Sequence, residues 1–174
     1  SKSGGFVGTV GEPDHNFSQN GDIIIKNCSV SGDLSNGTMS QWGSVPEMGG
    51  FVGYLSGENG GKISIEQSYA NINIHSLFGG NYKYMPPLMS IEQGIGGFVG
   101  TMKSAEIKEC YSLGNIGQLT DPNDDSDLDV IGRVGGFAGY VEESNIENSY
   151  SEVDINGHGA FGGFAGDVHT STIS

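Results

Sequence analysis

The sequence is poor in several residue types on which familiar classes of protein depend. It has only two cysteines and five prolines among its 174 residues, and this scarcity of cysteine excludes a disulfide-rich scaffold. Its 31 glycines do not recur at every third position, so a collagen triple helix is excluded as well. No apolar run approaches the roughly 20 residues that cross a bilayer, and we therefore expect no membrane insertion.

Positive charge is also scarce. Seven Lys and Arg residues stand against 21 Asp and Glu residues, which gives a formal net charge of −14. Phosphate backbones and anionic lipid surfaces repel a chain of this charge, so we expect no nucleic-acid partner. Metal cations suit such a chain better as partners.

The motifs of common hydrolases are missing from the sequence. A zinc peptidase needs the pattern His-Glu-x-x-His, and no histidine here is followed by Glu or has a second histidine four residues later (His15, His75, His158 and His169). The Gly-x-Ser-x-Gly turn of serine hydrolases is absent too. We therefore predict that the protein is not an enzyme and that its histidines lie in surface loops.

The chain is rich in one short repeat. The pentamer Gly-Gly-Phe-(Val/Ala)-Gly occurs five times, and its copies start 45, 47, 39 and 27 residues apart (residues 4–8, 49–53, 96–100, 135–139 and 162–166). We interpret the shortest spacing as the bare unit and the longer ones as that unit with insertions. A unit of this size has too little apolar surface to fold alone, but stacked neighbours bury a continuous core.

A second element follows each of the first four pentamers. It has an isoleucine, two polar residues, Ser or Cys, and then usually Tyr (residues 25–29, 65–69, 107–111 and 146–150). Apolar residues alternate after it, for example Val153 and Ile155, and this pattern is typical of a strand with one buried side. The sequence thus predicts an all-β fold, a β-solenoid of about five stacked repeats with two or three short strands per unit and loop insertions on one face.

Specific residues receive roles in this arrangement. The pentamer phenylalanines should form a ladder inside the solenoid (Phe6, Phe51, Phe98, Phe137 and Phe164). The glycine pair before each Phe should permit a sharp corner, and the glycine after it should let adjacent coils approach closely. Cys28 and Cys110 occupy the same small, inward position two coils apart, roughly 9–10 Å, so we expect two free, structural thiols.

The pentamers and the Ile-x-x-(Ser/Cys)-Tyr elements together resemble the GLUG-motif repeat family of bacterial secreted and surface proteins. That family includes adhesin-like proteins and immunoglobulin-A-cleaving metallopeptidases. The resemblance implies an extracellular or cell-surface location and an accessory role, and it supplies no catalytic residues. Ser29 stands where the other repeats carry Tyr, and the spacing is unusually wide, so we expect less regular stacking around residues 8–25.

We also expect residues 1–174 to form a single repeat domain that is part of a longer chain, with repeats starting near residues 4, 49, 96, 135 and 162. The segment Ser171-Thr-Ile-Ser174 reads as the opening of another repeat, because Ile173 follows its pentamer at the same distance as Ile146 and Ile107. Neither end shows a polar cap. Neighbouring repeats of the full-length chain are therefore expected partners.

One acidic segment imitates a calcium-binding loop. Oxygen-bearing side chains stand at alternate positions, which is the arrangement that a hard cation requires (Asp121, Asn123, Asp125, Asp127 and Asp129). Ser126 replaces the usual glycine at the sixth position, and Gly132 replaces the glutamate at the twelfth. The alternatives are a calcium site and a solvated acidic loop.

Three insertions fall at the same point of successive repeats (residues 35–48, 76–95 and 118–134). In a solenoid, equivalent insertions emerge side by side on one face. That face would carry Trp42, Tyr82 and Tyr84, whose aromatic rings could contact a glycan or a protein ligand of the host. The alternative is that these rings pack locally against the solenoid.

Three functions follow from these observations. The first is a non-catalytic extracellular scaffold or adhesive module of a bacterial surface protein. The second is an accessory, substrate-presenting region of a secreted zinc metallopeptidase. The third is a carbohydrate-active β-helix, which would need basic or paired carboxylate residues gathered in a groove.

Overall fold

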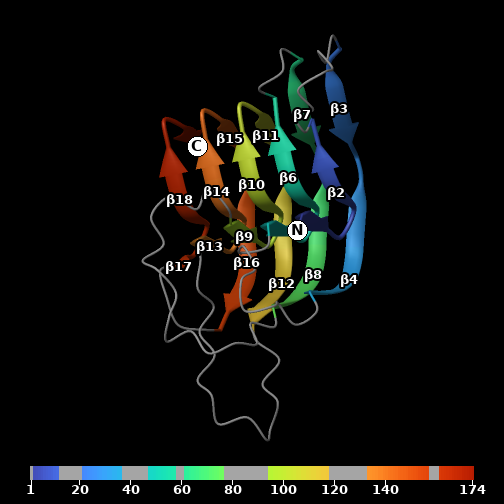
Figure 1. The fold of residues 1–174 in the computed structure, drawn as a ribbon, viewed down its shortest axis with the longest axis vertical. Coiled ribbons are helices and arrows are strands. Elements are labelled where there is room, and N and C mark those ends of the chain that lie inside the picture. Colours follow the sequence, from blue (N-terminus) through green and yellow to red (C-terminus); the bar gives the residue numbers. More distant parts are fainter. Residues whose placement is uncertain are drawn as a thin grey trace, which may run out of the picture.

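The computed structural model describes residues 2–11, 21–36, 47–57, 61–76, 94–117, 133–156 and 161–174. Within these ranges the chain has no helix, and its strands form four parallel sheets. Figure 1 shows the strands of each sheet side by side, with β2 and β4 at one end of the stack and β18 and β16 at the other. The predicted all-β solenoid is confirmed.

The four sheets are named A to D in the order in which the chain visits them. Sheet A contains β1 (Lys2–Gly4), β5 (Glu47–Gly49), β9 (Gly94–Gly96), β13 (Arg133–Gly135) and β17 (Phe161–Gly162). Sheet B contains β2 (Val7–Val10), β6 (Val52–Ser56), β10 (Val99–Lys103), β14 (Ala138–Glu142) and β18 (Ala165–His169). Sheet C contains β3 (Ile23–Lys26), β7 (Ile63–Glu66), β11 (Glu106–Lys108), β15 (Asn145–Glu147) and β19 (Thr172–Ile173). Sheet D contains β4 (Ser29–Asn36), β8 (Tyr69–Ser76), β12 (Tyr111–Gly117) and β16 (Tyr150–Ile155).

One passage through sheets A, B, C and D makes one coil, so each of the first four coils has four strands. The expectation of two or three strands per unit was wrong. The strands that the sequence did not predict are those of sheet A. These strands include the first glycine of each pentamer, and glycine is depleted in ordinary strands, so the sequence gives no strand pattern there. The pentamer therefore contains the end of one strand, a corner and the start of the next.

Equivalent residues of successive coils lie directly opposite each other. Ile107, for example, pairs with Ile65 on one side and Ile146 on the other. The register also holds in the first coil, where Val7–Val10 pairs with β6 and Ile23–Lys26 pairs with β7. The less regular stacking expected around residues 8–25 is therefore not seen on either side of residues 12–20, which lie outside the described residues.

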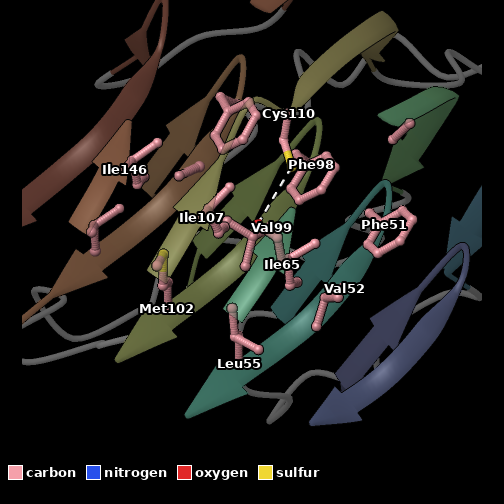
Figure 2. Close-up of a cluster of buried hydrophobic side chains, with 14 of the residues drawn as sticks. Phe51, Val52, Leu55, Ile65, Phe98, Val99, Met102, Ile107, Cys110 and Ile146 are labelled. Carbon is pink, nitrogen blue, oxygen red and sulfur yellow. Dashed lines mark hydrogen bonds between the residues drawn. The ribbon is translucent and has the colours of Figure 1, made fainter. Parts of the chain in front are cut away.

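The core contains the predicted ladder of phenylalanine rings. Neighbouring rings lie parallel with their centroids 4.6–4.8 Å apart, from Phe6 through Phe51, Phe98 and Phe137 to Phe164. Figure 2 shows Phe51 and Phe98 in successive coils, above the aliphatic side chains of sheets B and C. The three central rings are completely buried, whereas Phe6 is 45% exposed.

The pentamer glycines serve close packing rather than an unusual backbone conformation. The chain turns at each pentamer between sheets A and B, as predicted, but among the described glycines only Gly11, Gly32 and Gly114 have positive φ, and none of these belongs to a pentamer. A Cβ atom on Gly97 would overlap the carbonyl oxygen of Gly136 in the next coil. One on Gly53, the last glycine of its pentamer, would lie 2.7 Å from backbone atoms of the first coil, as the sequence predicted for that position.

The left-handed corners carry other residues. Between sheets B and C and between sheets C and D, the corner residue has a φ of 48–55° (Asn27, Gln67, Ser104, Glu109, Glu143, Asn148 and Thr170). The next residue is often a serine that stabilises the corner. Ser68 donates its hydroxyl to the carbonyl of Glu66 at 2.8 Å and accepts the amide of Cys28 from the previous coil at 3.1 Å. In six of these seven corners the amide of the corner residue also donates to a carbonyl of the next coil, so the neighbouring coil holds the corner in place.

Candidate binding surface

The outward side of sheet D is the longest regular surface of the described chain. Alternate residues of each strand point outward, and the residues between them enter the core. In β8, Tyr69, Asn71 and Asn73 face outward, whereas Ala70, Ile72 and Ile74 are buried. We call the outward side chains of β4, β8, β12 and β16 the D face.

Tyrosines form the first column of the D face. Tyr69 stacks on Tyr111 with 4.8 Å between ring centroids, and Tyr111 stacks on Tyr150 at 5.1 Å. Burial raises the pKa of the Tyr111 phenol, and the neighbouring phenols of Tyr69 and Tyr150 raise it further, so the central ring of the column stays uncharged at neutral pH. Because the rings cover each other's faces, Tyr111 offers a ligand its edge and hydroxyl group rather than a stacking platform.

Asparagine and aspartate side chains form another column on the D face, four residues after the tyrosine position of each strand. It runs from Asp33 through Asn73 and Asn115 to Asp154. The amide of Asn115 donates to the side-chain carbonyl of Asn73 at 2.8 Å, and the amide of Asn73 donates to Asp33 at 3.0 Å. These hydrogen bonds fix the amide orientations, so the column presents a preordered row of polar groups.

Cationic side chains lie elsewhere on the described surface. On sheet C, Lys26, Glu66, Lys108 and Glu147 alternate in charge from coil to coil. Lys26 contacts Glu66 at 3.0 Å and Lys108 contacts Glu147 at 3.3 Å. The Lys26 partner lowers the pKa of Glu66, by hydrogen bonding and by its charge. Sheet C therefore has a balanced outer surface, unlike the D face.

A second charged cluster lies where sheets A and B meet. The Arg133 guanidinium lies 4.5 Å from the centre of the Tyr140 ring and bonds Asp167 at 2.7 Å. His169 contacts the same carboxylate at 3.1 Å, and Lys103 contacts Glu142 at 3.0 Å. The Lys103–Glu142 pair thus connects the third and fourth coils, and the Arg133–Asp167 pair connects the fourth and fifth.

The two cysteines lie where the repeat places them. Both are free thiols, and Cys110 is buried whereas Cys28 is partly buried. The Cys110 sulfur lies 3.1 Å from the carbonyl of Lys108 and 3.6 Å from that of Ile65. Burial raises the pKa of this thiol to about 11, so it is an unreactive core group, as predicted.

The residues predicted from the sequence to bind a ligand or calcium lie outside the described residues. They are Trp42, Tyr82 and Tyr84 for the ligand, and Asp121, Asn123, Asp125, Asp127 and Asp129 for calcium. These predictions remain untested. The insertions that carry them each run from sheet D to sheet A, since they connect β4 to β5, β8 to β9 and β12 to β13. Within the described ranges, no three His, Cys, Asp or Glu residues are placed to hold a metal ion.

Sequence reasoning missed the D face as a surface. The signal was present in the Ser/Cys-Tyr step of three repeats and in the Asn or Asp residue four positions after each tyrosine. Recognising it required the register, because only the exact pairing of β8, β12 and β16 converts separate residues into columns.

Comparison with known proteins identifies one part of the chain. Residues 132–156, which include β13 to β16, match the family model described as the GLUG motif. No curated protein and no solved structure matches the chain significantly. No helix in the described residues has the length and apolarity needed to cross a membrane. The family resemblance drawn from the repeats is therefore confirmed, and the chain is a GLUG-motif-containing protein.

Proposed function

We propose that this chain is a non-catalytic scaffold and binding module of a secreted or surface-exposed bacterial protein, and that the D face is its binding surface. The observation that carries the proposal is the exact register of sheet D, which turns single residues into ordered columns of tyrosine and of asparagine and aspartate. The GLUG motif is compatible with such a module.

The architecture suits a scaffold because the core is continuous from coil to coil. Phe98 stacks on Phe51 and on Phe137, so each coil supplies part of the interior of both neighbours. A surface built on such a core keeps its side chains in place before a ligand arrives, and this preorganisation lowers the entropic cost of binding. The acidic surface also keeps a module of this kind soluble.

Two measurements test the proposal. In cells that produce the full-length protein, a protease added outside should cleave the repeat region without lysis. On arrays of host glycans and host proteins, the purified chain should bind a ligand, and Tyr111→Ser should weaken that binding. The serine is a matched change, because Ser29 occupies the equivalent position of the first coil.

Two outcomes would overturn the proposal. Protection of the repeats until the cells are lysed would exclude a surface location. Turnover of a polysaccharide by the purified chain would replace the binding module with a carbohydrate-active enzyme.

A further inference from the structure

Several columns of side chains alternate between two residue types from one coil to the next. The outer column of sheet C alternates Lys and Glu through the first four coils. Three further columns change with the same period, at the corner between sheets C and D, on the inner side of sheet D and in sheet B (Cys28, Ser68, Cys110 and Ser149; Gly32, Ile72, Gly114 and Val153; Thr9, Tyr54, Thr101 and Tyr140).

These columns divide the coils into two types. We call the first and third coils odd and the second and fourth coils even. Each type has its own set of residues at the four columns. The fifth coil does not continue the pattern, since Asp167 occupies its position in the sheet B column.

The corner column gives the two coil types different hydrogen-bonding roles. Cys28 in the first coil donates its amide to the Ser68 hydroxyl of the second coil at 3.1 Å. Cys110 repeats this bond to Ser149, between the third and fourth coils, at 3.2 Å. In the opposite order, the Cys110 sulfur lies 3.6 Å from the Ile65 carbonyl of the preceding even coil, and sulfur forms weaker hydrogen bonds than oxygen. The contact from an odd to an even coil therefore differs from the contact from an even to an odd coil.

The inner column of sheet D alternates small and large residues. The glycines of the odd coils have φ values of 146° and 115° (Gly32 and Gly114), a conformation that residues with a Cβ atom rarely adopt. The even coils have a β-branched residue at this position. A Cβ atom on Gly5 of the first coil would lie 3.2 Å from the Ile72 side chain, and one on Gly97 of the third coil would lie 2.8 Å from that of Val153. Each even coil thus fills the space above a pentamer glycine of the odd coil before it.

The column in sheet B alternates threonine with tyrosine. Tyr54 and Tyr140 are both buried. A cation lies over each ring, Lys2 at 3.9 Å from the centre of the first and Arg133 at 4.5 Å from the centre of the second. Thr101 pairs with both tyrosines in the sheet. Alternating large and small residues lets successive layers interdigitate, so this column also favours unlike neighbours.

We propose that the structural unit of this solenoid is a pair of coils, an odd coil followed by an even coil, and that the alternating columns act together to select unlike neighbours. Ladders of identical residues, such as the phenylalanines, pack equally well between any two coils. The alternating columns instead oppose contact between coils of one type, through like charges, two large side chains or two glycines at one position. This inference goes beyond the proposed function, because it concerns how the scaffold assembles and not what it binds.

A double-mutant cycle that exchanges three of the four columns between the second and third coils tests the proposal. One variant gives the second coil the odd set, and the other gives the third coil the even set (Glu66→Lys, Ser68→Cys and Ile72→Gly; Lys108→Glu, Cys110→Ser and Gly114→Ile). Each of these variants places coils of one type beside each other at two contacts. The combined variant also has two such contacts, because its second and third coils are unlike again.

Denaturant unfolding measures the loss of stability in each variant. We expect the combined variant to lose about as much as the more damaged of the two separate variants, although it carries all the substitutions. A milder cycle without Ile72→Gly and Gly114→Ile gives the same comparison if the larger changes prevent folding. In that cycle too, the combined loss should lie clearly below the sum of the two separate losses.

A matched control exchanges two residues of a column that does not alternate. Asn71→Leu and Leu113→Asn swap paired residues on the outer side of sheet D, and their losses should add. Additive losses in the test cycles would show that each coil is indifferent to the type of its neighbour and would overturn the inference. An equal departure from additivity in the control would also overturn it, because any two neighbouring strands would then behave in this way.

Discussion

The inner ladder of phenylalanines and the outer ladder of tyrosines have nearly the same geometry but very different surroundings. Phe51 and Phe98 stack at 4.8 Å with 3° between their rings, and so do Tyr69 and Tyr111. The central phenylalanines are completely buried, whereas Tyr150 is 48% exposed. The coil spacing therefore sets the stacking geometry, and burial decides how much each ring contributes to stability.

The two ladders also differ in completeness. A phenylalanine stands in every one of the five coils, whereas Ser29 interrupts the tyrosine column in the first coil. The structure thus accommodates a missing outer ring without loss of register in sheet D. Loss of a central inner ring should be more costly, because these rings are completely buried and their removal leaves a cavity in the core.

The sharpest test of this difference compares one ring from each ladder. Phe98→Ala should lower the free energy of unfolding by roughly 3–5 kcal/mol, because it leaves a cavity in a fully packed core. Tyr111→Ala should cost about 1 kcal/mol, the value of an aromatic pair with limited burial. Denaturant unfolding of both variants measures the two losses, and equal losses would mean that stacking matters more than burial.

The corner glycines give an intermediate effect. In Gly97→Ala the new methyl group would overlap the Gly136 carbonyl of the next coil, so we expect a loss of about 1–3 kcal/mol from overpacking. Gly163→Ala is the matched control at the same corner of the fifth coil, where a Cβ would have no atom within 4 Å. Similar melting temperatures for the two variants would contradict the close approach of coils at this corner.

The smallest effect that we predict near neutral pH concerns the buried thiol. The pKa of Cys110 is raised to about 11 from an ordinary value of 9.0 because burial disfavours the thiolate. The unfolded thiol ionises first, so this group lowers stability as the pH rises from about 9 towards 11 and has no effect below that window. Cys110→Ser should be nearly neutral at pH 7, because Ser68 and Ser149 occupy the same position.

Denaturant unfolding at pH 7 and pH 10.5 measures this effect as the difference between the parent and Cys110→Ser. Tyrosine ionisation acts on both proteins and cancels in that difference. An identical pH dependence of the two proteins would place Cys110 in contact with solvent.

The sequence predicted the features that depend on side-chain repetition. Five pentamers were enough to place the phenylalanine ladder, and the alternation after Tyr150 was enough to identify the side of β16 that packs against the core. The strands of sheet A were missed because Gly94 and Gly96 leave no apolar pattern to read. The left-handed corners were missed because Gln67 and Glu109 are not residues that favour this conformation. Their amides donate to carbonyls of the next coil, and these hydrogen bonds could not be predicted without the register.

The alternating charges on sheet C also constrain the order in which the coils can stack. If the chain skipped its third coil during folding, Glu66 would lie beside Glu147, and two like charges would meet at the contact distance of an ion pair. A skip of two coils would instead place Lys26 beside Glu147 and satisfy both. This row of alternating charges therefore disfavours mispairing in which one coil is skipped. The backbone hydrogen bonds alone would permit such mispairing, because the strand edges of all coils are alike.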